Sequence, residues 1–214
     1  MLYLILVILA ASASSEQSEF AILKFDKNGE FLTGWGSEGP ESGEFEHPHG
    51  IGVDSSGNVY VTDKGMHKCN VQKFTNDGEF LASWPVAIDN NLECGLEDVA
   101  IDSSGNVYVA DLAQNLTQKF TNDGQFIKSW GTEGAGDGQF RTPFGIAVDS
   151  ADNIHVVDTY NRRVQEFDSE GNFIQVWAHE GSHPGRTPDP HEIDIDSAGN
   201  FFIVDSLNAH EVDN

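Results

Sequence analysis

Short runs of alternating apolar and polar residues, separated by turn-forming residues, dominate the chain. Between Ile51 and Trp84 these runs lie at residues 51–53, 59–61, 71–74 and 80–84. Two of the segments between them, Asp54–Asn58 and Thr75–Gly78, contain Gly and Asn, which tolerate the positive φ of tight turns. β-branched and aromatic residues fill the runs, and such residues favour strands over helices. The pattern predicts a unit of four short antiparallel strands.

This unit recurs along the chain. Its first half appears at residues 49–63, 97–111, 144–158 and 191–205, and the aspartates that follow the first strands lie 48, 47 and 47 residues apart. Its second half, a Phe followed by a turn and a Trp, recurs at the same interval as Phe25…Trp35, Phe74…Trp84, Phe120…Trp130 and Phe167…Trp177. Tandem four-stranded units of this length predict an all-β fold, a β-propeller in which each unit is a blade.

The repeated segments resemble NHL repeats. The resemblance rests on PHGIGVDSSGNVYVTD, which starts at Pro48, and on PFGIAVDSADNIHVVDTYNRRVQEF, which starts at Pro143. It implies an NHL-repeat β-propeller domain over residues 20–214. Some NHL proteins are ubiquitin ligases or RNA regulators that carry RING and B-box zinc modules or basic surfaces. With two Cys and a formal net charge of −24, this chain has neither, so the resemblance indicates the fold and leaves the function open.

The phase of the repeat gives two alternatives for the ring. The segments at 21–25 and 31–35 match third and fourth strands, whereas those at 192–196 and 201–205 match first and second strands. These ends are complementary halves of one blade, which predicts about four blades, three whole and one composite. NHL propellers usually have six blades, so the alternative is a partial six-bladed propeller that lacks about two of them.

An apolar run opens the chain and ends at small residues that suit signal peptidase. Residues 1–10 are too few to span a bilayer, which takes about 20 apolar residues, and Ala11-Ser12-Ala13 follows. We therefore expect a cleaved signal peptide at residues 1–13, a short linker at 14–19 and a secreted, extracellular protein. In an oxidising compartment Cys69 and Cys94 either form a disulfide or remain two buried thiols.

The charge balance excludes two classes of partner. The chain has 35 acidic residues against 11 basic ones. Nucleic acids and anionic membrane surfaces are recognised by clustered Lys and Arg, so we expect neither nucleic-acid binding nor membrane insertion. The acidic surface serves solubility first. The sequence contains no Gly-x-Ser-x-Gly, P-loop or His-Glu-x-x-His motif and so offers no support for nucleophilic catalysis.

One position in each unit varies in residue type and includes side chains that can bind metal ions. The residue just before each innermost strand is His49, Glu97, Phe144 or His191. Equivalent positions of a propeller form a ring around its axis, so two imidazoles and one carboxylate would meet there. His49, Glu97 and His191 are therefore a candidate site for Zn²⁺ or another divalent cation. The alternative is that these residues vary freely from blade to blade and bind nothing.

The same ring resembles the zinc site of the peptidyl-amidoglycolate lyase propeller, whose motifs have the form Pro-His-Gly-Leu-x-x-Asp. The segment at 48–54 resembles the first motif and the segment at 190–196 the last. In the middle motif Phe144 stands where the family has His. The catalytic Tyr and Arg that the family implies are missing from residues 111–117, and Tyr160 with Arg162 occurs one blade later. These departures disfavour an enzyme.

Other candidates lie on the loops that join second to third strands, which share one face of a propeller. His47, His67, Tyr160, Arg162 and Arg163 are the candidate ligand-binding residues of this loop face, and Asn115-Leu-Thr117 is a glycosylation sequon on it. We therefore expect a non-catalytic binding module for an extracellular protein, peptide or glycan. The alternative is a zinc-dependent lyase or hydrolase at the channel mouth.

Overall fold

The computed structural model of the protein describes residues 21–65, 68–86, 94–178 and 189–206. The predicted signal peptide (1–13), the predicted linker (14–19) and His67 lie outside this part of the chain. The described residues are almost all strand and turn, with one 3₁₀ turn, η1 (Thr159–Asn161). They include no helix long and apolar enough to cross a membrane. The predicted all-β fold is confirmed.

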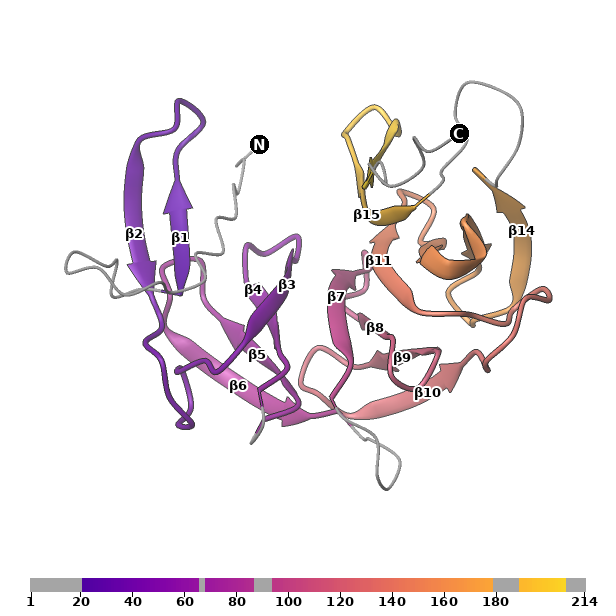
Figure 1. Ribbon diagram of the computed structural model, residues 1–214. Coiled ribbons are helices and arrows are strands. Elements are labelled where there is room, and N and C mark those ends of the chain that lie inside the picture. Colours follow the sequence, from indigo (N-terminus) through magenta and orange to yellow (C-terminus); the bar gives the residue numbers. More distant parts are fainter. Residues whose placement is uncertain (1–20, 66–67, 87–93, 179–188, 207–214) are drawn as a thin grey trace, which may run out of the picture.

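Three four-stranded antiparallel sheets form the body of the molecule, and a two-stranded hairpin lies at each end (Figure 1). The N-terminal hairpin is β1 (Ile22–Phe25) and β2 (Phe31–Trp35). Blade 1 is β3 (Pro48–Val53), β4 (Val59–Asp63), β5 (Asn70–Phe74) and β6 (Phe80–Pro85). Blade 2 is β7 (Leu96–Ile101), β8 (Val107–Asp111), β9 (Leu116–Phe120) and β10 (Phe126–Trp130). Blade 3 is β11 (Pro143–Val148), β12 (Ile154–Asp158), β13 (Arg163–Phe167) and β14 (Phe173–Trp177); the C-terminal hairpin is β15 (Pro190–Ile195) and β16 (Phe201–Asp205).

The turn between the first two strands of each unit is held by its leading aspartate. Asp54 Oδ1 accepts from the backbone N–H groups of Ser56 and Asn58 at 2.9 and 2.8 Å. Its Oδ2 accepts from the Asn58 amide and from the Tyr60 hydroxyl, at 2.8 and 3.1 Å. Gly57 sits at φ +86°, where only glycine is relaxed. The recurring Asp-x-x-Gly-Asn motif, in which Asp152 at φ +64° replaces the glycine in blade 3, is therefore a structural turn.

Neighbouring blades pack through the recurring Trp and the recurring turn Gly. The indoles of three of the four Trp residues each cover the glycine in the turn before the outer strand of the next blade, so a Cβ there would meet the ring at 2.4–2.7 Å; the pairs are Trp35 with Gly78, Trp84 with Gly124, and Trp130 with Gly171. Buried aromatic and aliphatic side chains fill the rest of each interface. The Phe…Trp spacing seen in the sequence is thus the spacing of the blade-to-blade contact.

Blades 1 and 2 are also joined covalently. Cys69, just before β5, forms a disulfide with Cys94, just before β7, across a sequence separation of 25 residues. Of the two alternatives left by the sequence, the structure has the disulfide.

The two terminal hairpins form separate sheets, so the composite blade is not formed. A closed four-bladed ring needs a quarter turn per blade, whereas the blades here follow an open arc with the hairpins at its two ends (Figure 1). Within the described part of the chain, β16 pairs with β15 alone. Phe202 and Val204 are 60% and 61% exposed, while their counterparts in blade 1, Tyr60 and Thr62, are fully buried. The described chain comprises three whole blades and two half-blades.

Candidate functional site

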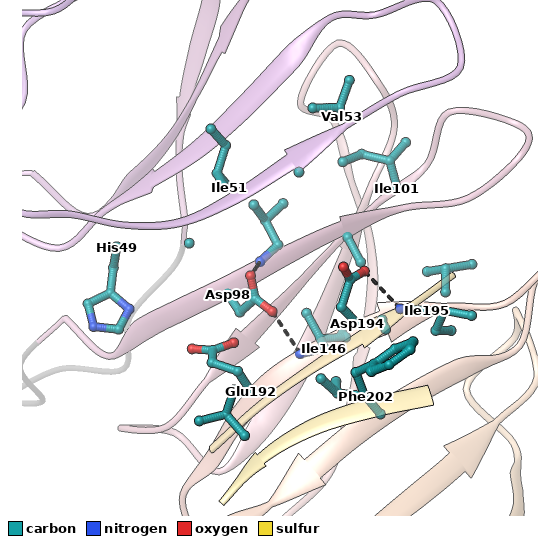
Figure 2. Close-up of a pocket in the computed structure, with 18 residues that line it drawn as sticks. His49, Ile51, Val53, Asp98, Ile101, Ile146, Glu192, Asp194, Ile195 and Phe202 are labelled. Carbon is teal, nitrogen blue, oxygen red and sulfur yellow. Dashed lines mark hydrogen bonds between the residues drawn. The ribbon is translucent and has the colours of Figure 1, made fainter. Parts of the chain in front are cut away.

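The first strands of the three blades and the C-terminal hairpin enclose a cavity of about 630 Å³ on the inner side of the arc (Figure 2). Most of its wall is aliphatic, including Ile51 and Val53 of β3, Ile101 of β7 and Ile146 of β11. The polar side chains are His49, Asp98, Glu192 and Asp194. His49, Asp98 and Glu192 lie at the starts of their strands, which is the end nearest the loop face. An apolar cleft with a few converging polar groups is the usual form of a small-ligand site.

The four ring residues predicted from the sequence are neighbours in space. His49 Nδ1 lies 3.0 Å from Glu97 Oε2. The ring centroids of His49 and Phe144 are 5.9 Å apart, and those of Phe144 and His191 are 4.9 Å apart. Phe144 therefore separates the two imidazoles and contacts both by ring edges.

Glu97 is the electrostatic centre of this ring, and it is already neutralised. Its side chain is only 2% exposed. Lys64, on the loop after β4, donates to both carboxylate oxygens at 2.7 and 2.8 Å. His49 completes the cluster; its burial lowers the pKa of the imidazole, and the nearby Lys64 charge lowers it further while Glu97 opposes both. The ring holds a Lys–Glu–His cluster in which the carboxylate is paired.

The ring residues do not fit a three-ligand zinc site. Zinc takes at least three protein donors that can reach one point. Here Phe144 occupies the middle position, and both oxygens of Glu97 accept from an ammonium group. Among the described residues, the one group whose three donor atoms all lie within 4.8 Å of one another is elsewhere, on blade 3.

That group, Asp149, His155 and Glu166, is explained by the fold. His155 takes the place of Tyr60 and Tyr108 of the other blades, with Nε2 lying 3.3 Å from Asp149 Oδ2. Its other ring nitrogen, Nδ1, accepts from the Trp177 indole N–H at 3.3 Å. Both imidazole nitrogens are therefore engaged in holding a turn and a Trp, as the tyrosine hydroxyl and ring do in blades 1 and 2.

Two carboxyl groups that the sequence did not predict as a site, those of Asp98 and Glu192, line the cavity as a pair. Asp98 Oδ1 accepts from Val99 N at 2.8 Å, and Oδ2 reaches across to blade 3 and accepts from Ile146 N at 3.0 Å. Figure 2 shows the Glu192 carboxylate pointing towards Asp98. Burial, and then the Glu192 charge, raise the pKa of Asp98 well above its usual range. Burial and the Glu97 charge raise the pKa of Glu192 to about 6.

A signal for this pair exists in the repeat. The residue after each ring position is Gly50, Asp98, Gly145 or Glu192, so glycine alternates with an acid. At Gly50 a Cβ would lie 2.5 Å from the Asp98 Cα, and at Gly145 it would lie 2.9 Å from the Glu192 Cα. Each glycine lets its inner strand approach the inner strand of the next unit, and the acid projects from that next strand.

The predicted loop-face residues have different surroundings. Tyr160 is 67% exposed and accessible to a ligand. Arg162 takes a left-handed conformation at the end of η1. The backbone N–H of His47 donates to Asp63 Oδ1 at 2.7 Å, which fixes this loop to the end of β4. His67 lies outside the described residues.

Arg163 is not a ligand-binding residue of this face. Its Nε donates to the fully buried Asp158 at 2.8 Å, and its Nη2 donates to the carbonyls of Gly136 and Gln139, both at 2.8 Å. Arg163 is only 8% exposed, and these three hydrogen bonds occupy its guanidinium group, so the residue is part of the scaffold. It ties the loop before β11 to the start of β13.

The sequon is only partly accessible. Asn115 is half-buried at φ +54°, and its amide oxygen accepts from Thr142 N at 2.9 Å. Thr117 is fully buried in β9. Glycosylation of Asn115 stays a prediction.

The comparisons with known proteins agree with this architecture. Residues 45–74 match the family model of the NHL repeat. A search of curated proteins finds no match. Among solved structures, a protein of unknown function from Bacteroides thetaiotaomicron is similar at 17% identity with a TM-score of 0.65, over 86% of this chain and 50% of that one.

Two further similar structures are lyases. A catalytically inactive virginiamycin B lyase from Staphylococcus aureus with quinupristin has 15% identity and a TM-score of 0.61, over 86% of this chain and 56% of that one. A streptogramin B lyase has 16% identity and a TM-score of 0.59, over 77% of this chain and 50% of that one. The chain therefore spans about half the length of these proteins, and identities this low establish a shared fold only.

Proposed function

We propose that this chain, an NHL-type β-propeller, is a secreted, non-catalytic binding module that holds its ligand in the inner cavity, entered from the loop face. The observation that carries the proposal is the cavity itself. It offers about 630 Å³ of mostly aliphatic wall with carboxyl groups at one end. The groups that a metal lyase would use are meanwhile occupied, because Glu97 is paired with Lys64 and Phe144 stands between the two histidines.

Secretion is supported by two features. Residues 1–13 have the pattern of a signal peptide. The Cys69–Cys94 disulfide suits an oxidising compartment, because cytosolic thiols are kept reduced. The partner we propose is an extracellular protein, peptide or glycan that presents a group small enough to enter the cavity.

One observation favours the alternative, a metal-dependent lyase. His49 and His191 lie on the same ring at the cavity mouth, on either side of Phe144. In this alternative Phe144→His would restore the missing donor. The unmodified chain would bind zinc poorly, and Phe144→His would bind it with higher affinity.

Blocking the cavity tests the proposed function. Val53 lines the cavity and is 45% exposed, so Val53→Trp fills space there without opening the core. Leu81→Trp is the matched control, because Leu81 is 46% exposed and lies on the outer strand of the same blade. The assay is thermal stabilisation by a panel of extracellular peptides, glycans and small metabolites, followed by mass spectrometry of each hit.

The proposal expects ligands that stabilise the unmodified chain and Leu81→Trp but not Val53→Trp, and that are recovered chemically unchanged. Hits that stabilise all three proteins equally would place binding outside the cavity. Zinc-dependent conversion of a hit, abolished by His49→Ala, would replace the binding function with the lyase alternative.

A further inference from the structure

The carboxyl pair of Asp98 and Glu192 lies at the loop-face end of the cavity. Burial and the Glu97 charge raise the pKa of Glu192, and the His191 and Lys64 charges oppose them. Six titratable groups face Glu192 from the packed elements: His49 of β3, Lys64 after β4, Glu97 and Asp98 of β7, and His191 and Asp194 of β15. Lys64 is committed to Glu97, because its ammonium donates to both oxygens of that carboxylate. Asp98 and Glu192 therefore face each other in surroundings that raise the pKa of both carboxyl groups.

The rest of the cavity wall is mostly aliphatic and solvates an ion poorly. It includes Ile51, Ile101 and Ile146 of three inner strands and the exposed ring of Phe202, with Asp194 as a further carboxyl group of the lining (Figure 2). Burying a charge against such a surface is costly unless the charge is paired. The cavity thus joins a negative end to an apolar body.

We infer that this end of the cavity binds a monovalent organic cation, a primary ammonium group carried on an apolar chain or ring. The ammonium lies between Asp98 and Glu192 and takes the place of a proton on the pair. The apolar part lies against the aliphatic wall. The inference rests on the proposed function and names its ligand class, which is shared by free amines and by a lysine side chain of a peptide.

A divalent metal ion suits the cavity less well. Calcium takes six to eight oxygen ligands, whereas the side chains of the lining offer the carboxyl groups of Asp98, Glu192 and Asp194 and are otherwise mostly hydrocarbon. Each Asp98 oxygen already accepts one backbone N–H, from Val99 or Ile146, which leaves it one lone-pair direction for a ligand. Two carboxyl groups with that capacity match the three N–H donors of a single ammonium group.

Proton exchange gives the inference a distinctive signature. The pKa of Glu192 is raised to about 6 by its burial and by the Glu97 charge. A cation that needs the ionised pair competes with this proton, so its affinity falls as the pH drops below about 6. Between about pH 7 and about pH 5 the expected loss is about tenfold, with release of up to one proton per ligand bound near the lower end.

The test is isothermal titration calorimetry with 4-phenylbutylamine, and with 4-phenylbutan-1-ol as a neutral probe of the same shape. Titrations in two buffers of different ionisation enthalpy count the protons released. Glu192→Gln removes the charge with the same side-chain shape, and Glu79→Gln makes the same change in an exposed turn of blade 1. N-acetyl-lysine methylamide, a lysine side chain in peptide form, distinguishes a peptide ligand from a free amine.

The inference expects the amine to bind at least tenfold more tightly than the alcohol, with proton release, and expects a loss of about tenfold or more in Glu192→Gln but not in Glu79→Gln. Equal affinity for amine and alcohol, or full affinity in a folded Glu192→Gln variant, would overturn it. Proton release is measured on the unmodified chain, so the result does not depend on the variant folding. If the amines fail while other ligands still lose binding in Val53→Trp, the proposed function survives and the cationic ligand is wrong.

Discussion

Lys64→Met should destabilise the protein more than any other single change at the cavity mouth. The substitution keeps most of the side-chain length but removes the ammonium that donates to both oxygens of Glu97, at 2.7 and 2.8 Å. At an effective dielectric constant near 20, opposite charges at that separation attract by about 6 kcal/mol before desolvation is counted. Removing one partner of a buried pair costs about 3–5 kcal/mol. Because a quarter of the Lys64 side chain is exposed, we expect the lower end, about 3 kcal/mol.

The origin of that cost is the charge left on Glu97, and three variants isolate it. Glu97→Gln should cost only about 1 kcal/mol, since Lys64 then turns its ammonium towards water. The double variant, Lys64→Met with Glu97→Gln, should be more stable than Lys64→Met alone. The assay is urea unfolding followed by tryptophan fluorescence and by far-ultraviolet circular dichroism, with agreement between the two probes as the condition for quoting a free energy.

The pH dependence gives an independent check. In Lys64→Met the buried charge of Glu97 keeps the His49 imidazole 3.0 Å away as its neighbour, so the cluster as a whole takes up a proton more readily in the folded chain than in the unfolded chain. Stability is therefore retained in acid and lost as the pH rises, so the deficit should be small near about pH 4 and full at about pH 7.5. A double variant less stable than Lys64→Met, or a deficit that does not change with pH, would refute the reasoning.

Two further predictions concern the scaffold. Replacing Cys69 and Cys94 by Ala opens a loop of 25 residues, and the chain-entropy estimate gives a loss of about 3.5 kcal/mol, which the same urea experiment measures under oxidising conditions. Gly124→Ala and Gly29→Ala introduce the same backbone strain, at φ +85° and +81°, but a Cβ meets the Trp84 ring at 2.4 Å in the first case and nothing within 4 Å in the second. Gly124→Ala should therefore lose about 1–3 kcal/mol more than Gly29→Ala, and equal losses would mean that the Trp–Gly contact does not hold the blades together.

Much of the fold could be predicted because each unit carries the same turn and packing residues. Asp54 with Gly57 and Asn58 specifies a turn through local hydrogen bonds, and those atoms lie within five residues of each other. The Phe and Trp spacing then specifies which surfaces meet between units. The closure of the ring was not predictable in the same way, because it depends on the rotation between successive blades, a quantity that no single motif encodes.

The site was predicted in position but not in chemistry. The proximity of His49, Glu97, Phe144 and His191 was expected from equivalent places in the repeat, but only His49 of the four is among the residues that line the cavity. The state of Glu97 depends on Lys64, which lies 33 residues away on another blade, and the pairing follows from a loop conformation that the repeat does not specify. A carboxylate that looks like a metal ligand in the sequence is thus an ion-pair partner in the fold.

The alternation of glycine and acid on the inner strands links the scaffold to the site. Gly50 and Gly145 let their strands approach the next strand so closely that a Cβ would meet backbone atoms there. Between β7 and β11 the equivalent position is Asp98, whose carboxylate accepts from the backbone N–H of Ile146 in the next blade. The acids therefore cannot be exchanged with the glycines without moving a blade. The negative end of the cavity thus arises at a position where neighbouring units differ, being glycine in two and an acid in the other two. The shared part of the repeat holds the inner strands that carry these acids.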